Sequence, residues 1–164
     1  MAWKAQRTIL MVGEGYDEVA FLNHLKKLYV QRGCGLSVTV KNARGKGARH
    51  VIEWTARQIA NIKYDVVAAL LDTDVDWNAA TEKMAGRNKI QVLKSEPCFE
   101  AMLLRMLSKP ANDAAPVLKK RFAPLVNGDA TQADNYATNF DDACLQAGRH
   151  KEPTIDALLK LLAP

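Results

Sequence analysis

Acidic side chains follow two apolar segments that lie far apart in this chain. Glu14 follows the apolar residues 8–12 after one glycine, and Asp72 and Asp74 follow the apolar residues 65–71. Carboxylate oxygens are the ligands that Mg²⁺ prefers, usually a few of them together with water and a substrate phosphate. A cation held in this way neutralises phosphate oxygens and activates water, so these residue types indicate metal-dependent phosphate chemistry.

The two acidic segments can meet only if the apolar segments before them are neighbouring strands. Ligands of parallel sheets bind beyond the carboxyl ends of the strands, where the strand order reverses. Asp74 shares a face with Asp72 if the backbone stays extended, and we expect Glu14 to meet this pair. Asp76 and Glu100 are further candidate ligands near the same edge, while Glu18 is expected to support a helix start or the ligands. Clustered carboxylates repel one another and need a cation or a proton, although acidic loops at strand ends are also often merely solvated.

Short apolar segments rich in β-branched residues predict strands, and apolar residues at every third or fourth position predict helices. The predicted strands cover residues 8–12, 36–41, 65–71 and 90–93, and the predicted helices cover residues 17–29, 51–62, 79–84 and 97–107. This alternation is typical of an α/β fold with a parallel sheet and right-handed crossovers. Asp17 is expected to cap the first of these helices.

The chain changes character after residue 107, where prolines become frequent. Short helices are predicted at residues 117–122, 140–148 and 154–162, with Thr154 as the cap of the last one. We therefore divide the chain into a metal-binding core, residues 1–107, and a C-terminal helical extension, residues 108–164, packed on the same domain.

Composition and charge limit the function classes. The chain has 164 residues and a net charge of +5, which fits a polyanionic partner without requiring one. Its three cysteines lack CxxC spacing, which argues against a disulfide framework or a structural zinc site and predicts a cytoplasmic protein. Neither a signal peptide nor a membrane span is expected, because no apolar segment is long enough.

Basic residues provide candidate contacts to a nucleic-acid backbone. Arg44, Lys46 and Arg49 lie in a glycine-containing segment, residues 42–50, which is predicted to be a flexible loop. Such a loop can contact successive phosphates of a nucleic-acid backbone, or it can simply be solvated. Lys94 comes directly after a predicted strand and is therefore expected to reach the acidic edge, as a catalytic and nucleic-acid-binding residue. Tyr136 could stack on bases or pack in the core.

Three segments, in this order, resemble the Toprim superfamily and most closely its RloB-like branch. Residues 12–18 (VGEGYDE) look like the family's strand and EGxTE turn, residues 70–74 (LLDTD) like its strand ending in DxD, and residues 95–104 (SEPCFEAMLL) like its S-x-P-C-F-E-x-W-L-L helix start. The resemblance covers about residues 8–106 and implies a Rossmannoid three-layer α/β/α fold with a mostly parallel sheet of about four strands. This fold is shared with primases, topoisomerases and OLD-type nucleases.

The resemblance also implies roles for the acidic residues. Glu14 would act as a ligand or general acid/base, and Asp72 and Asp74 would hold Mg²⁺, for which Mn²⁺ can substitute. RloB-like proteins are associated with restriction loci and phage defence. Met102 and Met106 stand where the family commonly has tryptophan and histidine, and this departure leaves catalysis open.

Three function hypotheses follow. The first is a metal-dependent nuclease acting on DNA or RNA, alone, as a homodimer or with a partner protein. The second is a non-catalytic nucleic-acid-binding or assembly module that keeps its acidic edge for structure. A phospho-acceptor signalling domain ranks last, because such domains usually carry paired acids after the first strand, where this chain has Gly-Glu-Gly.

Overall fold

The structure is a computed structural model that describes residues 7–163. Its strands are β1 (Arg7–Gly13), β2 (Leu36–Asn42), β3 (Val66–Asp72) and β4 (Ile90–Ser95). Its helices are α1 (Tyr16–Tyr29), α2 (Gly47–Gln58), α3 (Ala79–Arg87), α4 (Phe99–Met106), α5 (Ala115–Phe122), α6 (Asp142–Gly148) and α7 (Pro153–Leu162), with 3₁₀ turns η1 (Ala123–Val126) and η2 (Ala133–Tyr136). No helix in this described part is long and apolar enough to cross a membrane.

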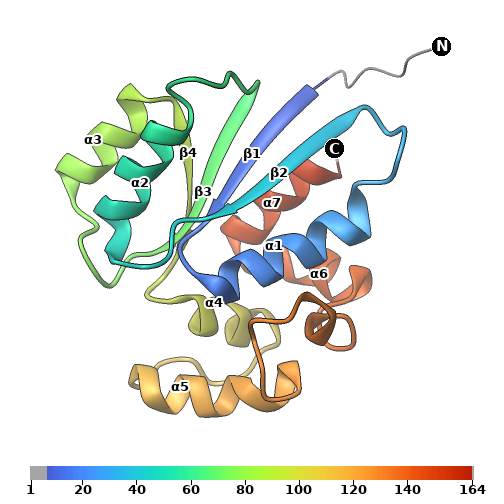
Figure 1. Cartoon of the computed structure of the whole chain (residues 1–164). Helices are drawn as coiled ribbons and strands as arrows, with labels where there is room; N and C mark the ends of the chain where they lie inside the picture. Colours follow the sequence, from blue (N-terminus) through green and yellow to red (C-terminus); the bar gives the residue numbers. More distant parts are fainter. Residues whose placement is uncertain (1–6, 164) are drawn as a thin grey trace.

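The four strands form one all-parallel sheet in the order β2-β1-β3-β4 (Figure 1). The chain runs outward from β1 to β2 and then crosses back over β1 to reach β3, so the strand order reverses between β1 and β3. The two strands before the acidic residues are therefore neighbours, as a meeting of these residues requires, and the order is consistent with a Toprim-like fold. A ligand site is expected beyond their carboxyl ends.

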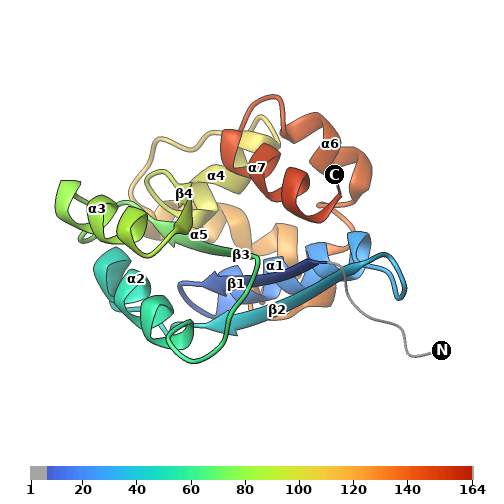
Figure 2. The same cartoon turned by 90° about the horizontal axis from the view of Figure 1, so that it is seen from above.

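Helices cover both faces of the sheet. Figures 1 and 2 show α2 and α3 side by side on one face, while α1 and α7 lie on the other. Successive side chains of a strand point to opposite faces, so Ile9 packs toward α1 and Leu10 packs toward α2. The predicted α/β fold with C-terminal helices is confirmed.

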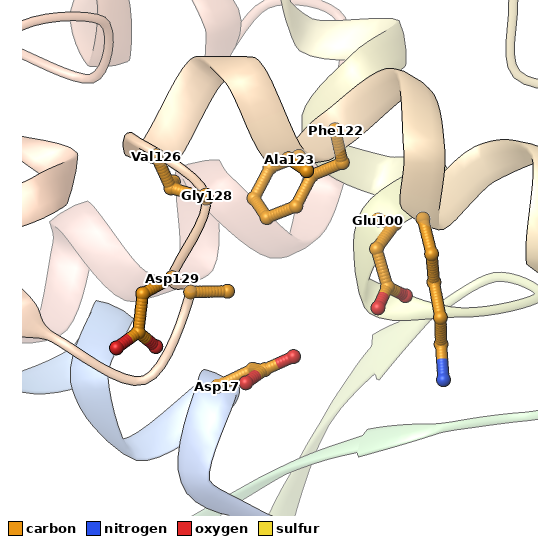
Figure 3. A pocket seen from close by; sticks show the side chains of 9 residues that line it. Asp17, Glu100, Phe122, Ala123, Val126, Gly128 and Asp129 are labelled. Atoms are coloured by element: carbon orange, nitrogen blue, oxygen red, sulfur yellow. The ribbon is translucent and has the colours of Figure 1, made fainter.

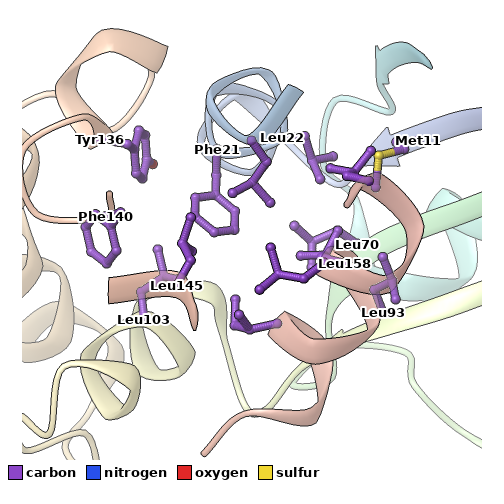
Figure 4. Close-up of a cluster of buried hydrophobic side chains, with 14 of the residues drawn as sticks. Met11, Phe21, Leu22, Leu70, Leu93, Leu103, Tyr136, Phe140, Leu145 and Leu158 are labelled. Carbon is purple, nitrogen blue, oxygen red and sulfur yellow. The ribbon is translucent and has the colours of Figure 1, made fainter. Parts of the chain in front are cut away.

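The larger core lies on the α1 face and contains side chains from both ends of the chain (Figure 4). Phe21 of α1 makes edge or tilted contacts with Tyr136 and Phe140 from the C-terminal region. Tyr136 is fully buried, and its hydroxyl donates a hydrogen bond of 2.8 Å to the Ala130 carbonyl. Packing therefore accounts for Tyr136, which is not available to stack on a base.

The basic segment 42–50 is less of a loop than predicted, because α2 begins at Gly47 instead of residue 51. Four consecutive residues, Arg44 to Gly47, have positive φ angles and turn the chain sharply before the helix starts. The Ala48 amide then donates a 3.1 Å hydrogen bond to the Val75 carbonyl, which fixes the helix start beside the loop after β3. The helix also ends at Gln58, four residues before its predicted end.

Two predicted helix caps are wrong. Helix α1 begins at Tyr16 with Gly15 in the N-cap position, so Asp17 lies inside the first turn. Helix α7 begins at Pro153, and the Thr154 hydroxyl donates a 2.6 Å hydrogen bond to the Lys94 carbonyl. Thr154 therefore links α7 to the end of β4.

Candidate metal centre

Backbone hydrogen bonds place Glu14 beside the end of β3. The Glu14 amide donates a 3.0 Å hydrogen bond to the Leu70 carbonyl, two residues before Asp72. The Glu14 carbonyl in turn accepts a 2.5 Å hydrogen bond from the Gly45 amide. Glu14 therefore lies at the strand-order reversal, between the end of β3 and the basic turn that precedes α2.

Three carboxylates converge at this point. Glu14, Glu18 and Asp72 each offer one oxygen, and these oxygens all lie within 4.8 Å of one another. We call this group the acidic triad, and it could hold a metal ion. Glu18 comes from the first turn of α1, where its carboxylate also accepts a 3.1 Å hydrogen bond from the Gly15 amide.

Glu18 reaches the triad because α1 packs very closely against the end of β1. A Cβ atom at Gly13 would lie 2.8 Å from Cγ2 of Val19 and 2.9 Å from its backbone nitrogen. A glycine at this position therefore permits the approach. Sequence reasoning gave Glu18 only a supporting role; its position four residues after Glu14, in the first turn of a helix, was the available signal.

The electrostatics of the triad favour a bound cation. Burial, together with repulsion from Glu14, raises the pKa of Glu18 to about 8. Burial and repulsion from Glu18 and Glu14 raise the pKa of Asp72 to about 9. Burial also raises the pKa of Glu14, although a hydrogen bond from the Asp72 amide opposes this effect.

The same carboxylates have few partners of the opposite charge. Within residues 7–163 no lysine, arginine or histidine forms an ion pair with the triad, and Oδ1 of Asp72 is buried without a hydrogen-bond partner. A buried, unpaired acceptor is costly, and a divalent cation with hard oxygen ligands would satisfy it. The residues present therefore fit the metal that the resemblance implies.

Asp74 and Asp76 lie outside the triad, on the exposed loop after β3. The strand ends at Asp72, and the Thr73 amide donates to the carbonyls of Ser95 and Pro97, at 3.3 and 3.2 Å. Asp72 and Asp74 would share a face only if the backbone stayed extended between them. The backbone instead bends at Thr73, so the two side chains do not form the predicted pair. Asp74 is still near enough for its charge to raise the pKa of Asp72.

Glu100 is buried in the first turn of α4, and its charge raises the pKa of each member of the triad. It also lines a neighbouring pocket of about 210 Å³. Figure 3 shows Glu100 close to Asp17 in this pocket, with Asp129 from the C-terminal region on its rim. The acidic edge therefore continues from the triad toward α5.

The basic residues predicted to bind nucleic acid lie in two different settings. Arg44 and Lys46 are exposed on the turn whose Gly45 amide contacts Glu14, and within the described residues neither forms an ion pair. Arg49 lies in α2 and pairs with Glu53 at 2.9 Å. The turn thus carries an unpaired basic residue on each side of the glycine whose amide contacts Glu14.

Lys94 has other partners. Its ammonium group is 3.8 Å from a carboxylate oxygen of Glu96 and 5.8 Å from the ring centroid of Trp77. In the described part of the chain it forms no ion pair with the triad. A catalytic role for Lys94 stays a prediction.

Comparison of the chain with models of protein families, with curated proteins and with solved structures finds no match. The resemblance to the Toprim superfamily therefore depends on the three sequence motifs and on the order of the strands.

Proposed function

We propose that this chain is a metal-dependent nuclease, and that the acidic triad is its active centre. The observation that carries the proposal is the convergence of three carboxylates at the strand-order reversal with one buried oxygen unpartnered. Carboxylates in such a position are the donor set of Mg²⁺ sites that act on phosphates. The positive charge of Arg44 and Lys46 nearby favours a polyanionic substrate.

The residues of the site would have different roles in the cleavage reaction. Glu18 and Asp72 are the more buried members of the triad and would hold the cation, Mg²⁺ or Mn²⁺, with Asp74 and Glu100 adding negative charge around it. A bound cation would stabilise charge on the phosphate and lower the pKa of an attacking water. Glu14 would accept the proton of that water, and burial raises the pKa of its carboxyl in the direction that strengthens it as a base.

The proposal also assigns the chain to a protein family, the RloB-like branch of the Toprim superfamily. A Toprim-like domain of the RloB-like branch would explain the three motifs, the strand order and the acidic triad together. A role in phage defence or in a restriction-associated system follows from that assignment, as does a homodimer or a partner protein as the working assembly.

A cleavage assay tests the proposal. Supercoiled DNA, linear DNA and RNA are incubated with the protein in Mg²⁺, in Mn²⁺ or in chelator. We expect cleavage only with metal, and we expect Glu14→Gln and Asp72→Asn each to reduce its rate by at least about 100-fold, the scale of losing general-base or metal-ion catalysis. Glu82→Gln, an exposed carboxylate on α3, is the matched control and should cleave at the wild-type rate.

The variants also separate the alternatives. Cleavage that persists in both Glu14→Gln and Asp72→Asn would place the active centre elsewhere. Binding of nucleic acid without cleavage in any metal would favour the non-catalytic module that retains a Toprim-like fold.

A further inference from the structure

Among residues 7–163 few large apolar side chains are exposed, and two of the four follow members of the acidic triad closely in the sequence. Those described are Tyr16, Ile62, Val75 and Val117, exposed by 63%, 50%, 53% and 45%. Tyr16 lies two residues after Glu14, and Val75 lies three residues after Asp72. The start of α1 and the loop after β3, which both adjoin triad residues in the sequence, therefore each present an apolar side chain to solvent.

Tyr16 differs from the other tyrosines of the chain. Tyr29 and Tyr64 pack against the two main cores, and Tyr136 is fully buried. Within residues 7–163, Tyr16 joins no core cluster or aromatic pair, and its hydroxyl makes no hydrogen bond. Packing within the described residues therefore does not explain why a large aromatic ring occupies this position.

The position of Tyr16 suits contact with a nucleotide next to the triad. It is the first residue of α1, in the turn that carries both Glu14 and Glu18. Consecutive Cα atoms are about 3.8 Å apart, so the Cα of Tyr16 lies at most about 7.6 Å from that of Glu14. This distance corresponds to about two nucleotide rises of about 3.4 Å along one strand.

We propose that Tyr16 is a stacking platform for a base next to the phosphate bound at the triad, and that the substrate is therefore single-stranded or locally unpaired nucleic acid. The inference rests on the proposed function and deepens it by naming the substrate class. An aromatic ring stacks on the face of any base, but paired and stacked bases of a duplex do not offer that face. Arg44 and Lys46 bind the backbone of the same strand.

Binding is measured apart from cleavage, so that the two proposals can fail separately. Protein is titrated into fluorescently labelled single-stranded DNA, single-stranded RNA and duplex DNA. The buffer contains chelator, so that metal-dependent cleavage does not occur. We expect Tyr16→Ala to weaken binding of the single strands by about 5- to 100-fold, the range for loss of one stacked base. Binding of the duplex should change by less than about twofold.

Substitutions at the same site and elsewhere keep the test specific. Tyr16→Phe and Tyr16→Trp preserve a stacking ring and should bind single strands within about threefold of wild type. Val117→Ala, at another exposed apolar position, on α5, is the matched control. The fluorescence of Tyr16→Trp should fall on addition of a single strand and not of a duplex.

Several outcomes would overturn the inference. Equal loss of single-strand and duplex binding in Tyr16→Ala would assign Tyr16 a general role, and a change in sedimentation instead of binding would assign it to an interface between copies of the chain. If wild type cleaves and Tyr16→Ala binds single strands normally, the nuclease proposal stands and this one fails. If single-strand binding depends on Tyr16 but no metal supports cleavage, the stacking role stands and the nuclease proposal fails.

Discussion

At the scale of single residues, the acidic triad links proton binding to stability. In the folded chain burial raises the pKa of Glu18 to about 8 and that of Asp72 to about 9, whereas glutamate and aspartate in an unfolded chain have pKa values of about 4. Between these values the folded chain binds more protons than the unfolded chain. The stability contributed by these protons is complete below about pH 4 and is lost as pH rises through the folded pKa values.

We therefore predict that, in chelator, the free energy of unfolding falls as pH rises from 5 to 9. The slope can reach about 1.4 kcal/mol per pH unit for each extra bound proton. Urea unfolding at several pH values measures this slope. In Asp72→Asn, whose side chain stays neutral, the slope should be shallower and the stability at pH 8 should exceed that of wild type.

The effect of Mg²⁺ on the stability of the fold is a second test of the acidic triad. Mg²⁺ at millimolar concentration should raise the unfolding midpoint of wild type most at pH 8 to 9, because a ligand that binds only the folded state stabilises it. Asp72→Asn should lose this response. A wild-type unfolding free energy that rises with pH in chelator would mean that the triad is not buried as described.

At the scale of elements, the approach of α1 to β1 decides whether Glu18 can join Glu14. We predict that Gly13→Ala destabilises the fold by about 1–3 kcal/mol, because the added Cβ meets the side chain and backbone of Val19 at under 3 Å. Because the added methyl group would move α1 away from β1, and Glu18 with it, Gly13→Ala should also weaken Mg²⁺ binding. Urea unfolding and calorimetric titration with Mg²⁺ measure the two effects.

Gly86→Ala is the matched control for this substitution. Gly86 lies in α3, and a Cβ there would meet no atom within 4 Å. Alanine in a helix interior is favoured over glycine by about 0.5–1 kcal/mol, so this variant should be slightly more stable and should bind Mg²⁺ normally. Equal stability of the two alanine variants would contradict the close packing of α1.

At the scale of the whole molecule, the C-terminal helices and the sheet share one core. Leu158 of α7 is fully buried in the cluster that contains Met11 and Leu93 from the sheet. We predict that Leu158→Ala lowers the free energy of unfolding by about 2–5 kcal/mol, in a single transition of the whole chain. Circular dichroism and a sheet-side fluorescence probe, followed in urea, should give the same midpoint.

Val117→Ala on α5 is expected to change stability by less than about 0.5 kcal/mol, because that side chain is largely exposed. Two separate transitions, with the sheet-side probe unaffected by Leu158→Ala, would show instead that residues 108–164 fold as an independent unit.

The sequence alone determined the alternation of strands and helices, and it led to the expectation that Glu14 meets Asp72. Strand and helix periodicities are local, and the chirality of crossover connections leaves few ways to arrange four parallel strands. Once β1 and β3 are neighbours, the residues that follow them must lie at one edge of the sheet. The Asp141 side chain caps α6 by accepting a hydrogen bond from the Cys144 amide, which is a contact between residues close in the sequence.

Only the tertiary structure decided that Glu18, and not Asp74, completes the acidic triad. The place of Asp74 depends on a bend at Thr73 whose hydrogen-bond partners lie more than 20 residues away along the chain. The place of Glu18 depends on how closely a helix can approach a strand that ends in glycine. Both are contacts between segments that no local pattern encodes, because they are set by packing and by backbone groups that find their partners only when the chain is folded.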